Sequence, residues 1–263
     1  ESQMNEKLTI GQYLQGDSIV HKMDARIKLI ITTLFIISIF FVDGFIGFAF
    51  YAAFVLFVIF IAEVPLKQIL RGLRPIIAVI ILTLILNIVT TPGETLFRFW
   101  IFNVTKEGLY RAVFVSIRII LLVFGTSLLT LSTSPLSLTD GIESLLKPLI
   151  RFHFPAHELA MMISIALSFI PTLFNEADKI RKAQTARGAD FESGNIIARA
   201  KAMIPLMVPL FLNSFHRAEE LGTAMEARCY RGGEGRTRLN PPVLKKSDVI
   251  IFIGVSIYFA LIA

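Results

Sequence analysis

The chain alternates long apolar runs with shorter polar, mostly basic segments. Five runs of 16 to 20 residues stand out, close to the roughly 20 residues that a helix needs to cross a bilayer. Backbone groups in lipid must be hydrogen-bonded within their own segment, so each run is predicted to be an α-helix. The pattern therefore predicts five transmembrane helices: Ile27–Val42, Phe45–Ala62, Pro75–Thr90, Ala112–Leu131 and Asp248–Ala263.

Between the fourth and fifth runs lies a long insert with a different pattern. It contains two intermittently apolar segments, His157–Arg187 and Asn195–Arg228, each apolar first and charged last. Prolines 171, 205 and 209 predict kinks, because proline removes a helical hydrogen bond and clashes with the preceding turn. Their apolar stretches of about 14 residues favour helices at the membrane surface over spans. An even pair of crossings would leave the topology unchanged, so both possibilities stay open.

The fold class is therefore predicted to be all-α, a polytopic membrane protein with a helical coupling domain of long kinked amphipathic helices. The chain is 54% hydrophobic and only 17% charged, against about 25% charged residues in a soluble protein. A cytoplasmic N-terminus would place 22 of the 26 Lys and Arg residues on the cytoplasmic side, as the positive-inside rule requires. This orientation divides the chain into an N-terminal segment (1–26), a four-helix membrane region (27–131), a cytoplasmic or interfacial domain (132–247) and a final span (248–263).

The two insert segments end on the same short pattern, Ala-x-x-Ala-Arg, in "AQTARG" (183–188) and "AMEARC" (224–229). Alanines three positions apart share one helical face and keep it narrow, while arginine supplies five donors in a rigid fork. Such a narrow helix end can enter a groove on a partner protein, where the arginine would bind a carboxylate or carbonyl oxygen. The simpler alternative is a stable helix end, since alanine favours helix and arginine complements the dipole. The candidate coupling residues are Ala186, Arg187, Gly188, Ala227, Arg228 and Cys229, supported by Ala183, Ala224 and Glu226.

Other candidate sites are weaker. Arg118 lies near the start of its predicted span, so its side chain is expected to snorkel toward water. Phe97–Phe102, with Trp100, is expected to lie at the outer interface. No nucleotide-binding spacing occurs, and Pro155 interrupts the pair His153 and His157, so no cofactor, metal, catalytic group or nucleic-acid partner is predicted.

The paired tips resemble the two Ala-Arg-Gly motifs of the transmembrane (T) component of energy-coupling factor (ECF) transporters. The N-terminal "HKMDARIKL" (His21–Leu29) is similar to that family's H-x-L-D-P-R-x-K motif, and the resemblance extends over nearly the whole chain. Two positions depart from it. Cys229 stands where the family has glycine, which predicts a weaker helix stop at Arg228. Ala25 stands where it has proline, although Asp24 can still cap the next helix.

The resemblance implies a non-catalytic scaffold in the cell membrane of a prokaryote. Its two tips would insert into grooves on two ABC-type ATPase subunits, and a separate substrate-binding membrane subunit would carry a vitamin or other micronutrient. The bilayer would surround the spans. Two alternatives remain: a stand-alone secondary transporter or channel, and an intramembrane enzyme. The spans contain few of the polar and acidic residues that either requires.

Overall fold

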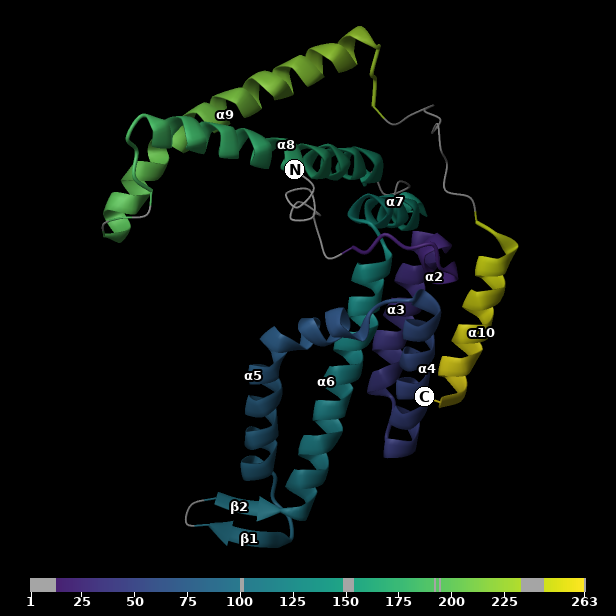
Figure 1. Ribbon diagram of the computed structural model, residues 1–263. Helices are drawn as coiled ribbons and strands as arrows, with labels where there is room; N and C mark the ends of the chain where they lie inside the picture. The colour runs from purple at the N-terminus through teal and green to yellow at the C-terminus, as the bar shows by residue number, and fades with distance from the viewer. Residues whose placement is uncertain are drawn as a thin grey trace. The chain divides into compact units, whose positions relative to one another are not determined.

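The computed structural model describes residues 13–99, 102–148, 154–191, 193, 195–232 and 244–262. These residues form helices and one small antiparallel hairpin (Figure 1). They divide into two compact units, one formed by the described residues of 13–145 and 244–262 and the other by those of 146–232. The elements in chain order are α2 (Ile19–Lys22), α3 (Ala25–Phe40), α4 (Phe45–Ala62), α5 (Leu66–Thr90), β1 (Thr95–Phe99), β2 (Phe102–Thr105), α6 (Lys106–Ser132), α7 (Pro135–Leu146), α8 (Ala156–Ala186), α9 (Ile196–Ala227) and α10 (Lys246–Ile262).

The predicted all-α architecture with several membrane-spanning helices is confirmed. Among the described residues, five helices are long and apolar enough to cross a membrane: α4, α5, α6, α8 and α9. The helices α3 and α10, which cover the first and fifth predicted spans, have 16 and 17 residues. The length and composition of α8 and α9 thus suit a crossing as well, and their location at the membrane surface stays a prediction.

The predicted span boundaries are closest for α4, which has the predicted ends Phe45 and Ala62. The largest difference is in α5, which starts at Leu66 and contains Pro75 inside the helix. The prediction began this span at Pro75, because proline usually starts or breaks a helix. In the structure the helix continues through the proline and bends along its length (Figure 1).

A short hairpin between α5 and α6 was not predicted. Strands β1 and β2 pair antiparallel, with Thr95 opposite Thr105 and Phe99 opposite Phe102. Trp100, the centre of the predicted interfacial anchor, lies outside the described residues, as does His153. The hairpin does not alter the helical class of the fold.

The core of the first unit is built from aromatic and aliphatic side chains of α3, α4, α6 and α10. Phe35 and Tyr51 lie with ring centroids 5.7 Å apart, and Tyr51 stacks on Phe259 at 5.4 Å. All three side chains are buried, and aromatic pairs of this geometry add stability beyond their buried area. This cluster fixes the final helix, α10, against the first two spans.

The N-terminal motif ties the same unit together at its other end. Asp24 caps α3, its Oδ1 accepting a hydrogen bond from the backbone N–H of Arg26 at 2.9 Å. This confirms that capping does not need proline at position 25. The buried Lys28 ammonium donates to the Ser132 carbonyl oxygen at 2.9 Å and to the Thr133 hydroxyl at 3.2 Å. The motif therefore joins the start of α3 to the end of α6.

Arg118 lies at the opposite end of this bundle. Its guanidinium donates to the carbonyl oxygen of Val42 at 3.2 Å, just beyond the last turn of α3. It also lies over the rings of Phe40 and Phe114, at 5.3 and 5.1 Å from their centroids. Cation–π contacts and one carbonyl thus hold the charge beside the end of α3. Because α6 begins at Lys106, Arg118 lies near the middle of its own helix, and its snorkelling toward water stays a prediction.

Candidate functional site: two arginine-tipped helix ends

The first candidate tip is the end of α8. The helix closes with two crossed backbone hydrogen bonds, from Gly188 N–H to the Thr185 carbonyl (2.9 Å) and from Ala189 N–H to the Gln184 carbonyl (3.0 Å). This is the Schellman arrangement, which needs a left-handed residue just after the cap. Gly188 fills that position with φ of +89°. Glycine thus closes α8 directly after its cap, Arg187.

The second tip, the end of α9, has the same geometry. Cys229 N–H bonds to the Glu226 carbonyl at 2.9 Å, and Tyr230 N–H bonds to the Met225 carbonyl at 3.0 Å. Cys229 takes the left-handed position with φ of +57°. The helix stop stays at the predicted place, because α9 ends at Ala227 with Arg228 as its cap, just as α8 ends at Ala186 with Arg187 as its cap. The expected weakening of this stop stays a prediction. The departure from glycine is accommodated by backbone strain, of about 1–2 kcal/mol for a residue with a Cβ.

This strain gives a prediction at the two caps. Cys229→Gly should stabilise the end of α9 by about 1 kcal/mol, because glycine takes a positive φ without a Cβ clash. Gly188→Ala should destabilise the end of α8 by a similar amount, although no atom lies within 4 Å of the added Cβ. Amide hydrogen exchange of the residues after each cap measures both changes. Equal exchange in the wild type and both variants would contradict the strain argument.

The structure brings each predicted set of coupling residues together on its own tip. All nine candidate residues are exposed. Within the part of the chain that the structure describes, neither Arg187 nor Arg228 forms an ion pair with a carboxylate. Both guanidinium groups are therefore available to an external acceptor: Ala183, Ala186, Arg187 and Gly188 form the first tip, and Ala224, Glu226, Ala227, Arg228 and Cys229 form the second.

The two tips lie at opposite ends of an antiparallel helix pair. Near the first tip, Gln184 donates to the Pro205 carbonyl at 3.5 Å, and further back Asn213 donates to Glu176 Oε1 at 3.0 Å. From the first bond to the second, the residue number decreases on α8 and increases on α9, so the two helices run in opposite directions (Figure 1). The part of α9 from Pro205 to Arg228 is roughly 35 Å long at 1.5 Å per residue. One groove for a single helix end cannot cover both tips.

The family resemblance implies that the two helices cross, but the residues at which they meet were not predicted. Besides the Asn213–Glu176 bond, the Arg217 guanidinium lies 5.9 Å from the centroid of the Phe169 ring. The repeated Pro-x-x-x-Asn, at 171–175 and 209–213, marks this region in the sequence. The repeat indicates that the two helices share a local structure, but it does not show which of their residues make contact.

Fold and tips together define a multi-pass helical membrane protein that exposes two matched, arginine-capped helix ends. Comparison with known proteins agrees with that class. The cobalt transport protein family (CbiQ) matches residues 16–239. The chain therefore belongs to a family of transporter membrane proteins, and its relatives identify which branch.

Several relatives named energy-coupling factor transporter transmembrane protein EcfT align over almost their full length. The protein of Thermosediminibacter oceani is 51% identical over 248 residues, covering 94% of each chain. That of Clostridium kluyveri is 51% identical over 94% of this chain and 92% of its own. That of Bacillus subtilis is 44% identical over 98% of each. The chain belongs to the EcfT family, the transmembrane components of ECF transporters.

Proposed function

We propose that the chain is a non-catalytic scaffold that couples ATP hydrolysis to uptake of a vitamin or other micronutrient. Two cytoplasmic ATPase subunits would each bind one arginine-tipped helix end, and a separate membrane subunit would bind the substrate. The observation that carries the proposal is the pair of exposed tips with one geometry at opposite ends of α8 and α9. One ATPase would need only one such tip, whereas two ATPases, with one groove each, need two.

The crossing makes the pair suitable for transmitting force. Residues of α8 and α9 are joined between the tips by hydrogen bonds and a cation–π contact, so movement of one tip is passed to the other helix. Pro171, Pro205 and Pro209 lie inside these helices, and each removes a backbone hydrogen bond that would stiffen the helix. An approach of two ATPases on ATP binding would then change the angle of the crossing.

The flanks of the two tips differ in charge. The last turns of α8 carry Lys179 and Lys182, with Lys182 paired to Asp178 at 2.7 Å. The last turns of α9 carry Glu219 and Glu226. Complementary charge favours one partner over another, so the groove for the first tip is expected to have a more acidic rim.

Cross-linking from the two tips tests the proposal. Cys229, the one cysteine of the chain, is exposed and accepts a thiol-directed photocrosslinker at the second tip. Ala189→Cys places a second thiol beside the first tip. In membranes containing the whole complex, the chain with both thiols should form a product of one scaffold and two ATPases. If the ATPases differ, each thiol should label a different one.

The single-thiol chains provide the controls. Wild type, and Ala189→Cys combined with Cys229→Gly, should each yield only a one-to-one product. Failure of the double-thiol chain to bind two ATPases would exclude one groove per tip. Substrate uptake by vesicles that contain the chain alone would instead establish the stand-alone transporter.

A further inference from the structure

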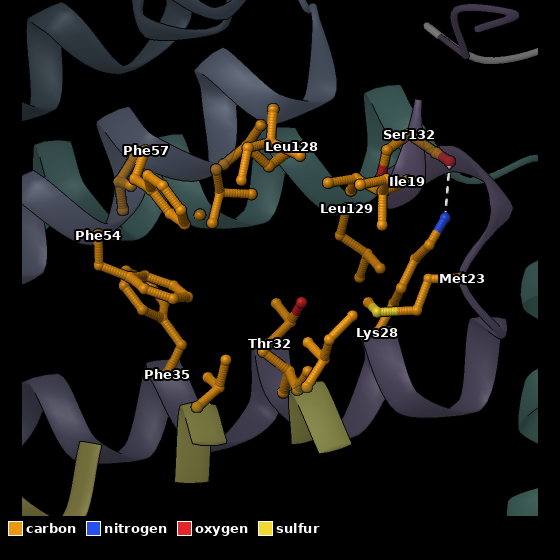
Figure 2. Close-up of a pocket in the computed structure, with 18 residues that line it drawn as sticks. Ile19, Met23, Lys28, Thr32, Phe35, Phe54, Phe57, Leu128, Leu129 and Ser132 are labelled. Atoms are coloured by element: carbon orange, nitrogen blue, oxygen red, sulfur yellow. Dashed lines mark hydrogen bonds between the residues drawn. The ribbon is translucent and has the colours of Figure 1, made fainter. Parts of the chain in front are cut away.

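An apolar cavity of about 300 Å³ lies between α3, α4, α6 and α10. Figure 2 shows its two different ends: the rings of Phe35, Phe54 and Phe57 lie at one, and Lys28 and Ser132 at the other. The wall between these ends is almost entirely hydrocarbon. The volume is in the range of ligand sites and exceeds what one or two trapped waters occupy.

A second cavity, of about 280 Å³, adjoins the polar end of the first. Both cavities are lined by Met23, Lys28 and Ser132, so they share one wall. The second is polar, with basic side chains of Lys22 and Arg26 and several hydroxyl groups. Asp24 and Asp140 also line it, so three basic side chains, counting Lys28, face two carboxylates and the lining keeps a formal charge of +1.

Two features of the polar cavity favour an anion. The Lys28 ammonium is buried and donates to three neutral acceptors, the carbonyls of His21 and Ser132 and the Thr133 hydroxyl. The Asp24 and Asp248 carboxylates act on its charge, and it is the excess of basic over acidic side chains in the lining that favours an anion. The cavity also contains Ser134 and Ser137 at the start of α7, where the helix dipole is positive.

We propose that the two cavities together bind one anionic phospholipid. Part of an acyl chain would occupy the apolar cavity, and the phosphate would lie in the polar cavity near Lys28, Lys22 and Arg26. The predicted cytoplasmic N-terminus puts this polar end in the inner leaflet, where a headgroup belongs. A protein helix fits less well, because the apolar cavity adjoins a polar cavity lined by Lys22 and Arg26, whose charges complement an anionic headgroup. The lipid would hold α3, α4 and α10 together as a structural ligand.

Lipid counting on the purified complex tests the proposal. Native mass spectrometry of the full complex in mild detergent, with added phosphatidylglycerol, should show one phospholipid retained by this chain. Thr32 lines the apolar cavity, and Thr32→Phe should reduce the retained lipid at least tenfold. Thr33 is the exposed next residue on α3 and does not line it, so Thr33→Phe should retain the lipid.

Headgroup variants test the polar cavity separately. Lys22→Gln with Arg26→Gln should abolish the preference for phosphatidylglycerol over phosphatidylcholine, and excess inorganic phosphate should not displace the lipid. If Thr32→Phe does not fold, Leu129→Phe fills the cavity from α6 instead. Equal retention by the Thr32 and Thr33 variants would overturn the proposal. Loss of the substrate-binding subunit from Thr32→Phe at unchanged lipid content would also overturn it, in favour of a partner helix.

Discussion

Reversing the charge of both tips, by Arg187→Glu with Arg228→Glu, is expected to release both ATPases and abolish uptake. A guanidinium buried in a groove contributes charge-assisted bonds of about 1.5–3 kcal/mol, and glutamate would add repulsion against the same acceptors. Each single variant should lose at least tenfold of its ATPase binding. It should not lose all of it, because the other tip still occupies one groove. Retention of tagged ATPases by the detergent-solubilised chain, and uptake in cells, measure the two effects.

Lysine at the same two positions distinguishes a guanidinium that binds a partner's groove from an arginine that only stabilises its own helix end. If each arginine only complements a helix dipole, Arg187→Lys with Arg228→Lys should behave like the wild type, because the charge is kept. If each guanidinium binds its acceptor with two parallel donors, lysine loses that geometry and should show an intermediate loss. Both arginines are exposed, so none of these changes should alter folding, which unfolding in detergent can verify. Full retention by the double glutamate variant would exclude the tips as docking sites.

Sequence reasoning located the helices well where a helix is defined by its own residues. The ends of α4 were predicted correctly because polar or turn-forming residues flank an unbroken apolar run, with Gly44 before it and Glu63 after it. The early start of α5 was missed, because helical residues Leu66 to Arg74 include three basic side chains and precede a proline. Local periodicity does not show that a helix bends at a proline and continues.

The candidate tips were predictable for the same local reason, since a cap depends on a few consecutive residues. Their placement at opposite ends of a pair was not, because it depends on which residues of α8 meet α9, such as Gln184 with Pro205. The strain at Cys229 shows a further limit. Sequence indicates that a glycine is missing, but only the backbone shows that cysteine adopts the positive φ at the same position. The paired cavities likewise join residues from six helices, α2, α3, α4, α6, α7 and α10, and had no signal in the sequence.

Lys28→Met is expected to destabilise the membrane unit by about 2 kcal/mol. Methionine matches the length of lysine but has no donor, so the Ser132 carbonyl and the Thr133 hydroxyl lose the partner they share. Ser132 and Thr133 are buried, at 2% and 3% exposed, and an unsatisfied buried polar group costs about 1–3 kcal/mol. Removing the ammonium also removes its own desolvation cost, which offsets part of that loss. A net loss of stability is expected because three acceptors, the His21 carbonyl included, lose the one ammonium that they share.

The midpoint of thermal unfolding in detergent measures this effect, with Lys67→Met as the matched control. Lys67 lies in the first turn of α5, is exposed and lines neither cavity. Lys67→Met should therefore leave the midpoint nearly unchanged, while Lys28→Met lowers it clearly. A raised midpoint for Lys28→Met would mean that desolvation of the ammonium outweighs its three hydrogen bonds. Burial of the Lys28 ammonium would then lower the stability of the fold. Its place in the N-terminal motif would be explained by binding of an anionic ligand in the polar cavity.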